Sequence, residues 1–272
     1  MAGFQFSQHN VNFVGGGSPT VVLAHGFGSN QNSWRHLLPW LAARHRVMLF
    51  DMAGSTAANA AFYTLTTHDG IEDYAQDLTA LLDRHGIGRA IYLGHGAGGT
   101  IGLVAARARP DLFQRLVLVG ASPCHLEDGA YRGGFTASEL AGMLSAMGRN
   151  YRDWVEMFAP AVAGIGPEQR AAAEDYAASL LELPPPIALA AARTLFGADI
   201  RPLLAEVRTP TLVVQSRQDP LAPMAAAEHL EWHLPHGRIA LLDAEGHLPH
   251  MTAPDRLLRL LAAHGLDRAA AA

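Results

Sequence analysis

The chain has 272 residues, of which 49% are hydrophobic and 17% charged, so it can bury a sizeable core and is not a disordered chain. Its net charge is −5, its 20 bases are all arginines that form no stripe, and no apolar run reaches about 18 residues, which argues against binding nucleic acid or spanning a membrane. The N-terminus lacks the pattern of a secretory signal and the single cysteine, Cys124, excludes an internal disulfide, so we expect a cytoplasmic globular protein.

Short apolar and β-branched runs alternate with helical patterns along most of the chain. We expect strands at residues 20–24, 46–50, 90–94, 116–120, 211–215 and 239–242. Helical patterns occupy residues 33–43, 71–85, 97–108, 225–233 and 254–264. Because most strand runs are continuously apolar, we expect strands that are covered on both faces. The alternation of strand and helix therefore predicts an α/β fold with a mostly parallel central sheet and helices on both faces.

One long segment breaks this alternation. Residues 125–197 hold four helix-like stretches, at 137–147, 151–158, 167–181 and 186–196, with no convincing strand among them. Roughly 70 residues of short helices would struggle to form a core of their own, which disfavours a separate second domain. We predict one domain, with a core of residues 1–124 and 198–272 and a four-helix insertion at 125–197. The alanine-rich tail, residues 268–272, is expected to fray.

Four loops that follow predicted strands carry residues that could take part in catalysis. Loop 25–29, HGFGS, has glycines that let a backbone N–H approach a ligand, as in half of an oxyanion hole. Loop 94–99, GHGAGG, joins a strand to a helix. The two later loops contribute Asp219 and His247. A strand-to-helix turn, then an acid, then a histidine is the chain order of hydrolases that carry a nucleophile on that turn.

These motifs resemble those of the RsbQ-like α/β-hydrolases, a group that includes the bacterial stress regulator RsbQ and the plant karrikin and strigolactone receptors. The resemblance runs from about residue 5 to about residue 265 and is carried by HGFGSNQNSW, FDMAGS, YLGHGAGG, VLVGASPCHLEDGAYRGGF, NYRDWVEMFAP, ARTLFGADIR, QSRQDPLAP and EGHLPH. It implies an α/β-hydrolase fold with a helical lid, and hydrolysis of a small apolar ester or acyl substrate by a Ser-His-Asp mechanism. It implies no cofactor, and by analogy with RsbQ a signalling protein partner.

The resemblance assigns roles by position. Asp219 and His247 match the family's acid and histidine, and the backbone N–H groups of Phe27 and Ala97 match its oxyanion hole. The resemblance also implies a mostly apolar pocket beneath the lid, lined by Phe27, His95, Phe135, Trp154, Phe158, Phe196 and Leu248. Aromatic residues at helical spacing also fit the packed core of the lid, so both interpretations of Trp154, Phe158 and Phe196 stay open.

The nucleophile position departs from the family pattern, because residue 96 is glycine where the family has serine. Glycine has no hydroxyl, so no acyl-enzyme can form, and this chain should be inactive or severely impaired. Glycine reaches positive φ without the strain of about 1–3 kcal/mol that a residue with a Cβ meets there, so the fold should survive. Two interpretations remain: a hydrolase whose serine has been replaced, or a non-covalent protein that binds a small ligand or uses only a base and an oxyanion site. The intact Asp219 and His247 favour the first.

Three competing interpretations come from the same residues. The GHGAGG loop also fits the dinucleotide motif G-x-G-x-x-G, but no acid follows the next strand, which reads VLVGAS. Histidine pairs at 233/236 and 247/250 have the spacing of metal ligands, yet no cysteine or suitably spaced acid accompanies them, so we expect no metal. Asp51 follows a strand, but we expect it to serve a turn or a helix cap because Asp219 already fills the acid position.

Overall fold

The computed structural model describes residues 9–60, 63 and 68–266, and a seven-stranded sheet in the order β1-β3-β2-β4-β5-β6-β7 lies at its centre. Strand β1 runs antiparallel to β3, and every other neighbouring pair is parallel. The strands are β1 Asn12–Val14, β2 Val21–Ala24, β3 Val47–Leu49, β4 Ala90–His95, β5 Phe113–Val119, β6 Thr211–Gln218 and β7 Gly237–Glu245. The predicted α/β fold with a mostly parallel sheet is confirmed. The tail expected to fray, residues 268–272, lies outside the described part of the chain.

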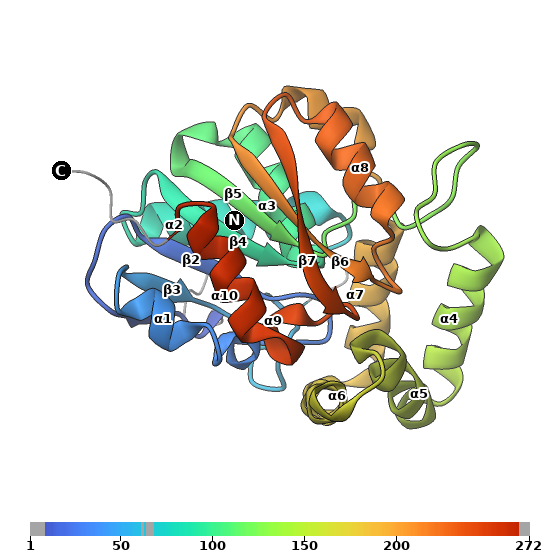
Figure 1. Cartoon of the computed structure of the whole chain (residues 1–272). Coiled ribbons are helices and arrows are strands. Elements are labelled where there is room, and N and C mark those ends of the chain that lie inside the picture. Colours follow the sequence, from blue (N-terminus) through green and yellow to red (C-terminus); the bar gives the residue numbers. More distant parts are fainter. Residues whose placement is uncertain (1–8, 61–62, 64–67, 267–272) are drawn as a thin grey trace.

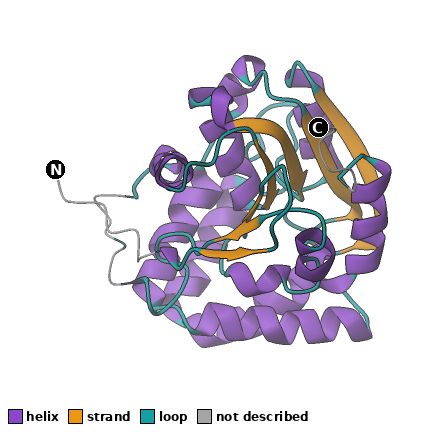
Figure 2. Ribbon diagram, turned by 90° about the vertical axis from the view of Figure 1, so that its left-hand side faces the viewer, coloured by secondary structure: helices purple, strands orange, loops and turns teal. Residues whose placement is uncertain are grey.

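Helices cover both faces of the sheet (Figure 2). Successive residues of β2 show why its sequence is apolar throughout: Val22 belongs to the core on one face, and Val21 and Leu23 to the core on the other. The first core is completed by α2 Ile71–Arg84, α3 Ala97–Ala108 and α8 Met224–His233, and the second by α1 Leu38–Ala42 and α10 Pro254–Ala263. Among the described residues, no helix is both long and apolar enough to cross a membrane.

Four helices separate β5 from β6 and lie to one side of the sheet (Figure 1). They are α4 Ala137–Arg149, α5 Tyr151–Ala163, α6 Pro167–Leu181 and α7 Pro185–Gly197. Thr136 begins the first of them with a capping box, in which its side chain accepts from the Glu139 N–H and the Glu139 carboxylate accepts from the Thr136 N–H. Their buried side chains form a core that also takes in Leu221 and Leu248 from the sheet's loops. This helical insertion therefore shares its core with the loops that follow β6 and β7.

The single helix expected over residues 33–43 is wrong. The structure has a 3-10 turn at Gln31–Trp34 and then a short α1 that begins at Leu38, with Pro39 in its first turn. Proline has no N–H to donate and clashes with the preceding turn, so it is tolerated at a helix start but not within a helix. Apart from 3-10 turns, two short elements were not predicted, namely β1 and α9 Pro249–Thr252, because three or four residues are too few to show a period.

The glycines of the GHGAGG loop allow α3 to lie directly against the sheet. A Cβ built on Gly98 would be 2.5 Å from the His25 carbonyl oxygen and 2.7 Å from the Ala24 carbonyl oxygen. Backbone atoms at that distance cannot yield in the way that a flexible side chain can. Close packing of helix on strand therefore accounts for this glycine without a bound dinucleotide.

Gly98→Ala is expected to lower the free energy of unfolding by about 1–3 kcal/mol, because the added methyl group would overpack a backbone contact. Gly142→Ala in α4 is the matched control, since nothing lies within 4 Å of a Cβ built there. In a helix interior that change should raise stability by roughly 0.5–1 kcal/mol. Urea unfolding of both variants measures the difference, and equal effects at the two positions would contradict the packing argument.

Candidate active site

The residues that the sequence singled out meet at the carboxyl ends of three strands. Gly96 lies between β4 and α3, Asp219 directly follows β6, and His247 follows β7 by two residues. Because β4, β6 and β7 all run in the same direction, their carboxyl ends share one edge of the sheet. This is the edge at which α/β proteins place their ligands.

Asp219 and His247 form a buried hydrogen-bonded pair. His247 Nδ1 lies 2.9 Å and 2.8 Å from the two carboxylate oxygens, and the Asp219 side chain is fully buried. The same carboxylate accepts the backbone N–H groups of Leu221 and Ala222 at 2.9 Å and 3.0 Å. Burial by itself raises the pKa of Asp219, but the attraction and hydrogen bond of His247 and the two backbone N–H groups outweigh it and lower that pKa below its usual value. An ionised Asp219 only accepts hydrogen bonds, so it fixes the His247 proton on Nδ1 and leaves Nε2 as a base.

Gly96 faces that base. Its backbone has φ +50° and ψ −120°, and a Cβ built on it would lie 3.0 Å from His247 Nε2. The conformation is anchored by the Gly96 N–H, which donates to the Val119 carbonyl oxygen at 2.9 Å, and by the Thr100 N–H, which donates to the Gly96 carbonyl oxygen at 3.2 Å. A side chain at this position would therefore begin next to the histidine nitrogen that can take a proton.

The nearby hydroxyl groups are engaged elsewhere. Thr100 donates to the Ser122 carbonyl oxygen at 2.9 Å, and Ser122 donates to the Cys124 carbonyl oxygen at 2.7 Å. The Cys124 thiol contacts the Leu126 carbonyl oxygen, and burial raises its pKa, which disfavours the reactive thiolate. None of these three side chains is hydrogen-bonded to His247.

Two backbone N–H groups are available as donors beside Gly96. Ala97 is the first residue of α3, so its N–H has no partner within the helix. The Phe27 N–H donates to no atom of the described residues, and both residues line the same cavity as His247. These are the two positions expected for an oxyanion hole.

A cavity of about 20 Å³ lies between these groups and the helical insertion, which is room for about one water molecule. Of the expected pocket residues, Phe27, His95 and Phe196 line it. The other four do not line it: Trp154 and Leu248 belong to the core of the insertion, and Phe135 and Phe158 pack against that core. Four lining residues were not anticipated, namely His125, Tyr176, Leu195 and Leu221. Of these, His125, Leu195 and Leu221 stand in quoted family motifs, which is a sequence signal, whereas Tyr176 lies outside them.

Comparison with known proteins gives a consistent result. A family model described as the alpha/beta hydrolase fold matches residues 19–141. A karrikin insensitive 2 receptor of Petunia hybrida is 39% identical over 94% of this chain and 95% of its own, and strigolactone esterase D14 of Arabidopsis thaliana is 37% identical over 94% and 97%. This chain belongs to the α/β-hydrolase family. Among solved structures, a hydrolase of Oleispira antarctica superimposes with a TM-score of 0.90 at 30% identity, covering 94% of both chains.

The family assignment confirms the resemblance to the karrikin- and strigolactone-receptor group of α/β-hydrolases, and it displaces the dinucleotide-binding alternative. Asp51 has the capping role that was expected. Its carboxylate accepts the backbone N–H of Gln31, at the start of a 3-10 turn, at 2.9 Å, and the Asn10 side-chain amide at 2.9 Å. This acid therefore holds a loop of the hydrolase fold and takes no part in the hydrogen bonds of Asp219 and His247.

A much larger groove, of about 660 Å³, is lined by none of the three central residues of this site. It runs between α6, α10 and the end of β7, and charged side chains such as Arg217 and Asp243 line it. Many of these charges are already paired with one another, as Arg217 is with Asp243 at 3.1 Å. The small apolar cavity beside Gly96 is therefore the candidate active site of this α/β-hydrolase.

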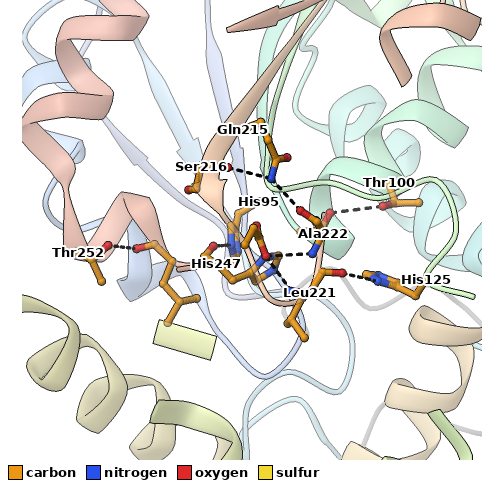
Figure 3. A network of polar contacts seen from close by, with 12 residues as sticks. His95, Thr100, His125, Gln215, Ser216, Leu221, Ala222, His247 and Thr252 are labelled. Atoms are coloured by element: carbon orange, nitrogen blue, oxygen red, sulfur yellow. Dashed lines mark hydrogen bonds and ion pairs between the residues drawn. The ribbon is translucent and has the colours of Figure 1, made fainter. Parts of the chain in front are cut away.

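Two neutral histidines hold the site in place (Figure 3). The His95 ring nitrogen Nε2 lies 2.7 Å from the His247 carbonyl oxygen, and Nδ1 of His125 lies 3.1 Å from the Leu221 carbonyl oxygen. Burial and the nearby His247 lower the pKa of His95 to about 3 and that of His125 to about 4. Both rings therefore stay uncharged at neutral pH and donate one N–H each to the loops that carry Asp219 and His247.

Acidification is expected to destabilise the protein between about pH 6.5 and pH 4. An unfolded histidine titrates near pH 6.5, so the unfolded state takes up protons before the buried rings of His95 and His125 do. The free energy of unfolding should fall as the pH falls, by up to about 1.4 kcal/mol per pH unit for each histidine. Urea unfolding at a series of pH values measures this slope. His125→Asn keeps a donor for the Leu221 carbonyl and should reduce the slope by up to about 1.4 kcal/mol per pH unit, the contribution of one histidine. An unchanged slope would contradict a lowered pKa for His125.

Proposed function

We propose that this protein binds a small, mostly apolar ester or related acyl compound beside Gly96. Its scaffold is arranged for Ser-His-Asp hydrolysis, but without the serine no covalent intermediate forms. The observation that carries the proposal is the direction of the missing side chain. A Cβ at Gly96 would lie 3.0 Å from His247 Nε2, and Asp219 holds the opposite nitrogen of that ring.

With serine at residue 96, the scaffold would support each step of acyl transfer. The serine Oγ would attack the carbonyl carbon while His247 Nε2 takes its proton, and Asp219 would stabilise the imidazolium that forms. The negative charge on the carbonyl oxygen would be met by the N–H groups of Phe27 and Ala97. His247 would then return the proton to the leaving alcohol, and water would release the acid in a second round.

With glycine at residue 96, the attacking oxygen is missing but the other groups are in position. Loss of the nucleophile costs about 10⁶ in kcat in a well-studied serine protease. The remaining route is direct attack by a water molecule from which His247 removes a proton. This chain is therefore inactive or severely impaired as an esterase, while its binding site is otherwise complete.

The helical insertion acts as a lid in this proposal, with residues 1–124 and 198–272 as the core. Two contacts support that role. The Tyr176 hydroxyl of α6 donates to the Phe27 carbonyl oxygen at 3.0 Å, and the His247 N–H donates to the Val162 carbonyl oxygen of α5 at 2.8 Å. A cavity of about 20 Å³ holds no ester, so the ligand enters only when the insertion moves. Such a movement would act directly on the loops of the base and of one oxyanion donor.

A second candidate function is non-covalent ligand sensing. Gly96 favours it, because a receptor that does not turn over its ligand needs no hydroxyl there, and one of the relatives is named a karrikin insensitive 2 receptor. In this version the lid carries the signal to a protein partner, by analogy with such receptors. The single, buried Cys124 supports a reducing compartment, and so the cytoplasm, for either function.

Gly96→Ser is expected to raise kcat/KM on a short activated ester such as 4-nitrophenyl acetate by about 10³-fold or more. The matched control is Gly96→Ala, which adds the same Cβ, and the same strain of about 1–3 kcal/mol at positive φ, without the hydroxyl. His247 must shift by a few tenths of an ångström in both variants, so their difference isolates the hydroxyl.

In the Gly96→Ser background, His247→Ala should abolish the gain, because His247 Nε2 is the described atom nearest to the Cβ position of residue 96, apart from its chain neighbours. Release of 4-nitrophenol measures the rates, and circular dichroism verifies the fold. If the serine variant is no more active than the alanine variant while both are folded, the replaced-nucleophile proposal is wrong.

The unmodified chain should bind an ester without consuming it. Calorimetry with 4-nitrophenyl butyrate is expected to show saturable binding, with the intact ester recovered afterwards, because the carbonyl meets donors but no nucleophile. Rapid turnover by the unmodified chain would contradict the role given to Gly96. Absence of binding by folded protein would contradict the site itself.

A further inference from the structure

The basic nitrogen of the candidate site has no partner, and it lies next to the space that a side chain at residue 96 would fill. Apart from chain neighbours, the described atoms nearest to a Cβ built on Gly96 are those of the His247 ring, with Nε2 at 3.0 Å, and the Gly26 Cα at 3.9 Å. Both hydrogen bonds of the His247 ring involve Nδ1, so Nε2 bonds to no described atom. Glycine therefore leaves the base uncovered.

Donors for a negatively charged oxygen line the same cavity. The N–H groups of Phe27 and Ala97 have no acceptor among the described atoms, and both residues line the cavity together with Gly96 and His247. In ester hydrolysis such donors stabilise the oxygen of a carbonyl group that a nucleophile has attacked. They stabilise an enolate in the same way, because there too the negative charge lies on the former carbonyl oxygen.

A carbonyl group held by these two donors would meet a base but no free nucleophile among the described side chains. The hydroxyl and thiol groups of Thr100, Ser122 and Cys124 are bonded to backbone carbonyl oxygens. The α carbon of a ketone is about 1.5 Å from its carbonyl carbon, a length close to that of the bond which a serine oxygen would form there. The α carbon can therefore occupy the place of the missing oxygen and present its C–H bond to the unpartnered nitrogen.

We propose that the unmodified chain catalyses proton transfer at the carbon next to the carbonyl group of a small, mostly apolar ketone, with His247 Nε2 as the base. The C–H bond breaks and its proton passes to Nε2, its electron pair forms a C=C bond, and the carbonyl π pair moves to the oxygen. Asp219 stabilises the imidazolium, and the N–H groups of Phe27 and Ala97 stabilise the enolate oxygen. Return of a proton to the carbon regenerates the ketone, so the cycle consumes no co-reactant. This activity goes beyond the proposed function and uses the same site.

Deuterium exchange into 2-tetralone tests the proposal. This small apolar ketone carries an acidic CH2 group next to its carbonyl, and proton NMR in D2O follows the loss of that signal. The unmodified chain should exchange it at least 10²-fold faster than the His247→Ala variant, because a positioned general base contributes about 10²–10⁴-fold. The chain has 14 histidines, and this variant keeps all the others, so it also controls for imidazole groups elsewhere.

Substitution of residue 96 should change the two activities in opposite directions. Gly96→Ser is expected to slow the exchange about ten- to 100-fold while it raises esterase activity, because its hydroxyl displaces the α carbon from the base. Gly96→Ala should slow the exchange without any gain in esterase activity. Gly142→Ala in α4 is the matched control and should leave the exchange rate unchanged, since nothing lies within 4 Å of a Cβ built there. Circular dichroism verifies that all three variants are folded.

Asp219→Asn tests the position of the histidine proton. The new amide can still accept from the N–H groups of Leu221 and Ala222, as the carboxylate does at 2.9 Å and 3.0 Å. Its NH2 group would donate to His247 Nδ1, which moves the ring proton to Nε2 and removes the base. Exchange should then fall as far as in His247→Ala, while the Kd for 4-nitrophenyl butyrate stays within about three-fold, because ester binding needs no base.

The outcomes separate this activity from the proposed function. Exchange that 4-nitrophenyl butyrate inhibits with a constant equal to its Kd supports proton transfer in this cavity. Exchange no faster than in His247→Ala, unaffected by Gly96→Ser, or not inhibited by the ester overturns it, and the proposed function stands if the ester binds and Gly96→Ser gains esterase activity. If the ester does not bind and Gly96→Ser gains nothing, the proposed function fails, whereas exchange that still depends on His247 and Gly96 supports proton transfer on its own.

Discussion

The hydrogen-bonded pair of Asp219 and His247 is the interaction on which the rest of the site depends. A fully buried carboxylate would be strongly destabilising without partners, and this one has three: the His247 ring and the backbone N–H groups of Leu221 and Ala222. Because these partners come from two loops, one hydrogen-bonded group fixes the loop after β6 against the loop after β7. The helical insertion then docks on the same place, where the Val162 carbonyl oxygen accepts the His247 N–H.

The two histidines beside this pair, His95 and His125, add no positive charge to it. Burial, and after it the nearby His247, lower the pKa values of both His95 and His125, so both rings remain neutral at ordinary pH. Each uses its single ring N–H to hold a carbonyl oxygen of the loop that it faces. The histidines therefore act as neutral donors, and among the described residues Asp219 is the carboxylate that contacts the His247 ring.

Much of the fold and the centre of the site could be predicted from the sequence because they follow local rules. Continuous apolar runs marked the buried strands, and chain order with strand-to-loop position marked Asp219 and His247. The pocket wall could not be predicted in the same way, since helical spacing does not tell which aromatic side chain faces a cavity. Trp154 stacks on Tyr151 and Phe158 within the insertion, with ring centroids 5.8 Å and 4.5 Å away, whereas Phe196 reaches the cavity.

The buried pair also bears on which of the two functions Gly96 favours. In the sequence, an intact acid and histidine favour a hydrolase that has lost its serine, since a binding protein has no evident use for them. The structure supplies a use: a buried carboxylate that loses a hydrogen-bond partner costs about 1–3 kcal/mol or more, because its charge is then less well satisfied. Asp219 and His247 would therefore be retained for stability even in a protein that never cleaves a bond. Their presence is compatible with both functions, and the orientation of the Cβ position at Gly96 toward His247 Nε2 becomes the stronger argument for a catalytic scaffold. That orientation has no structural benefit in a chain that carries glycine, because a glycine there makes no contact with the ring through a side chain.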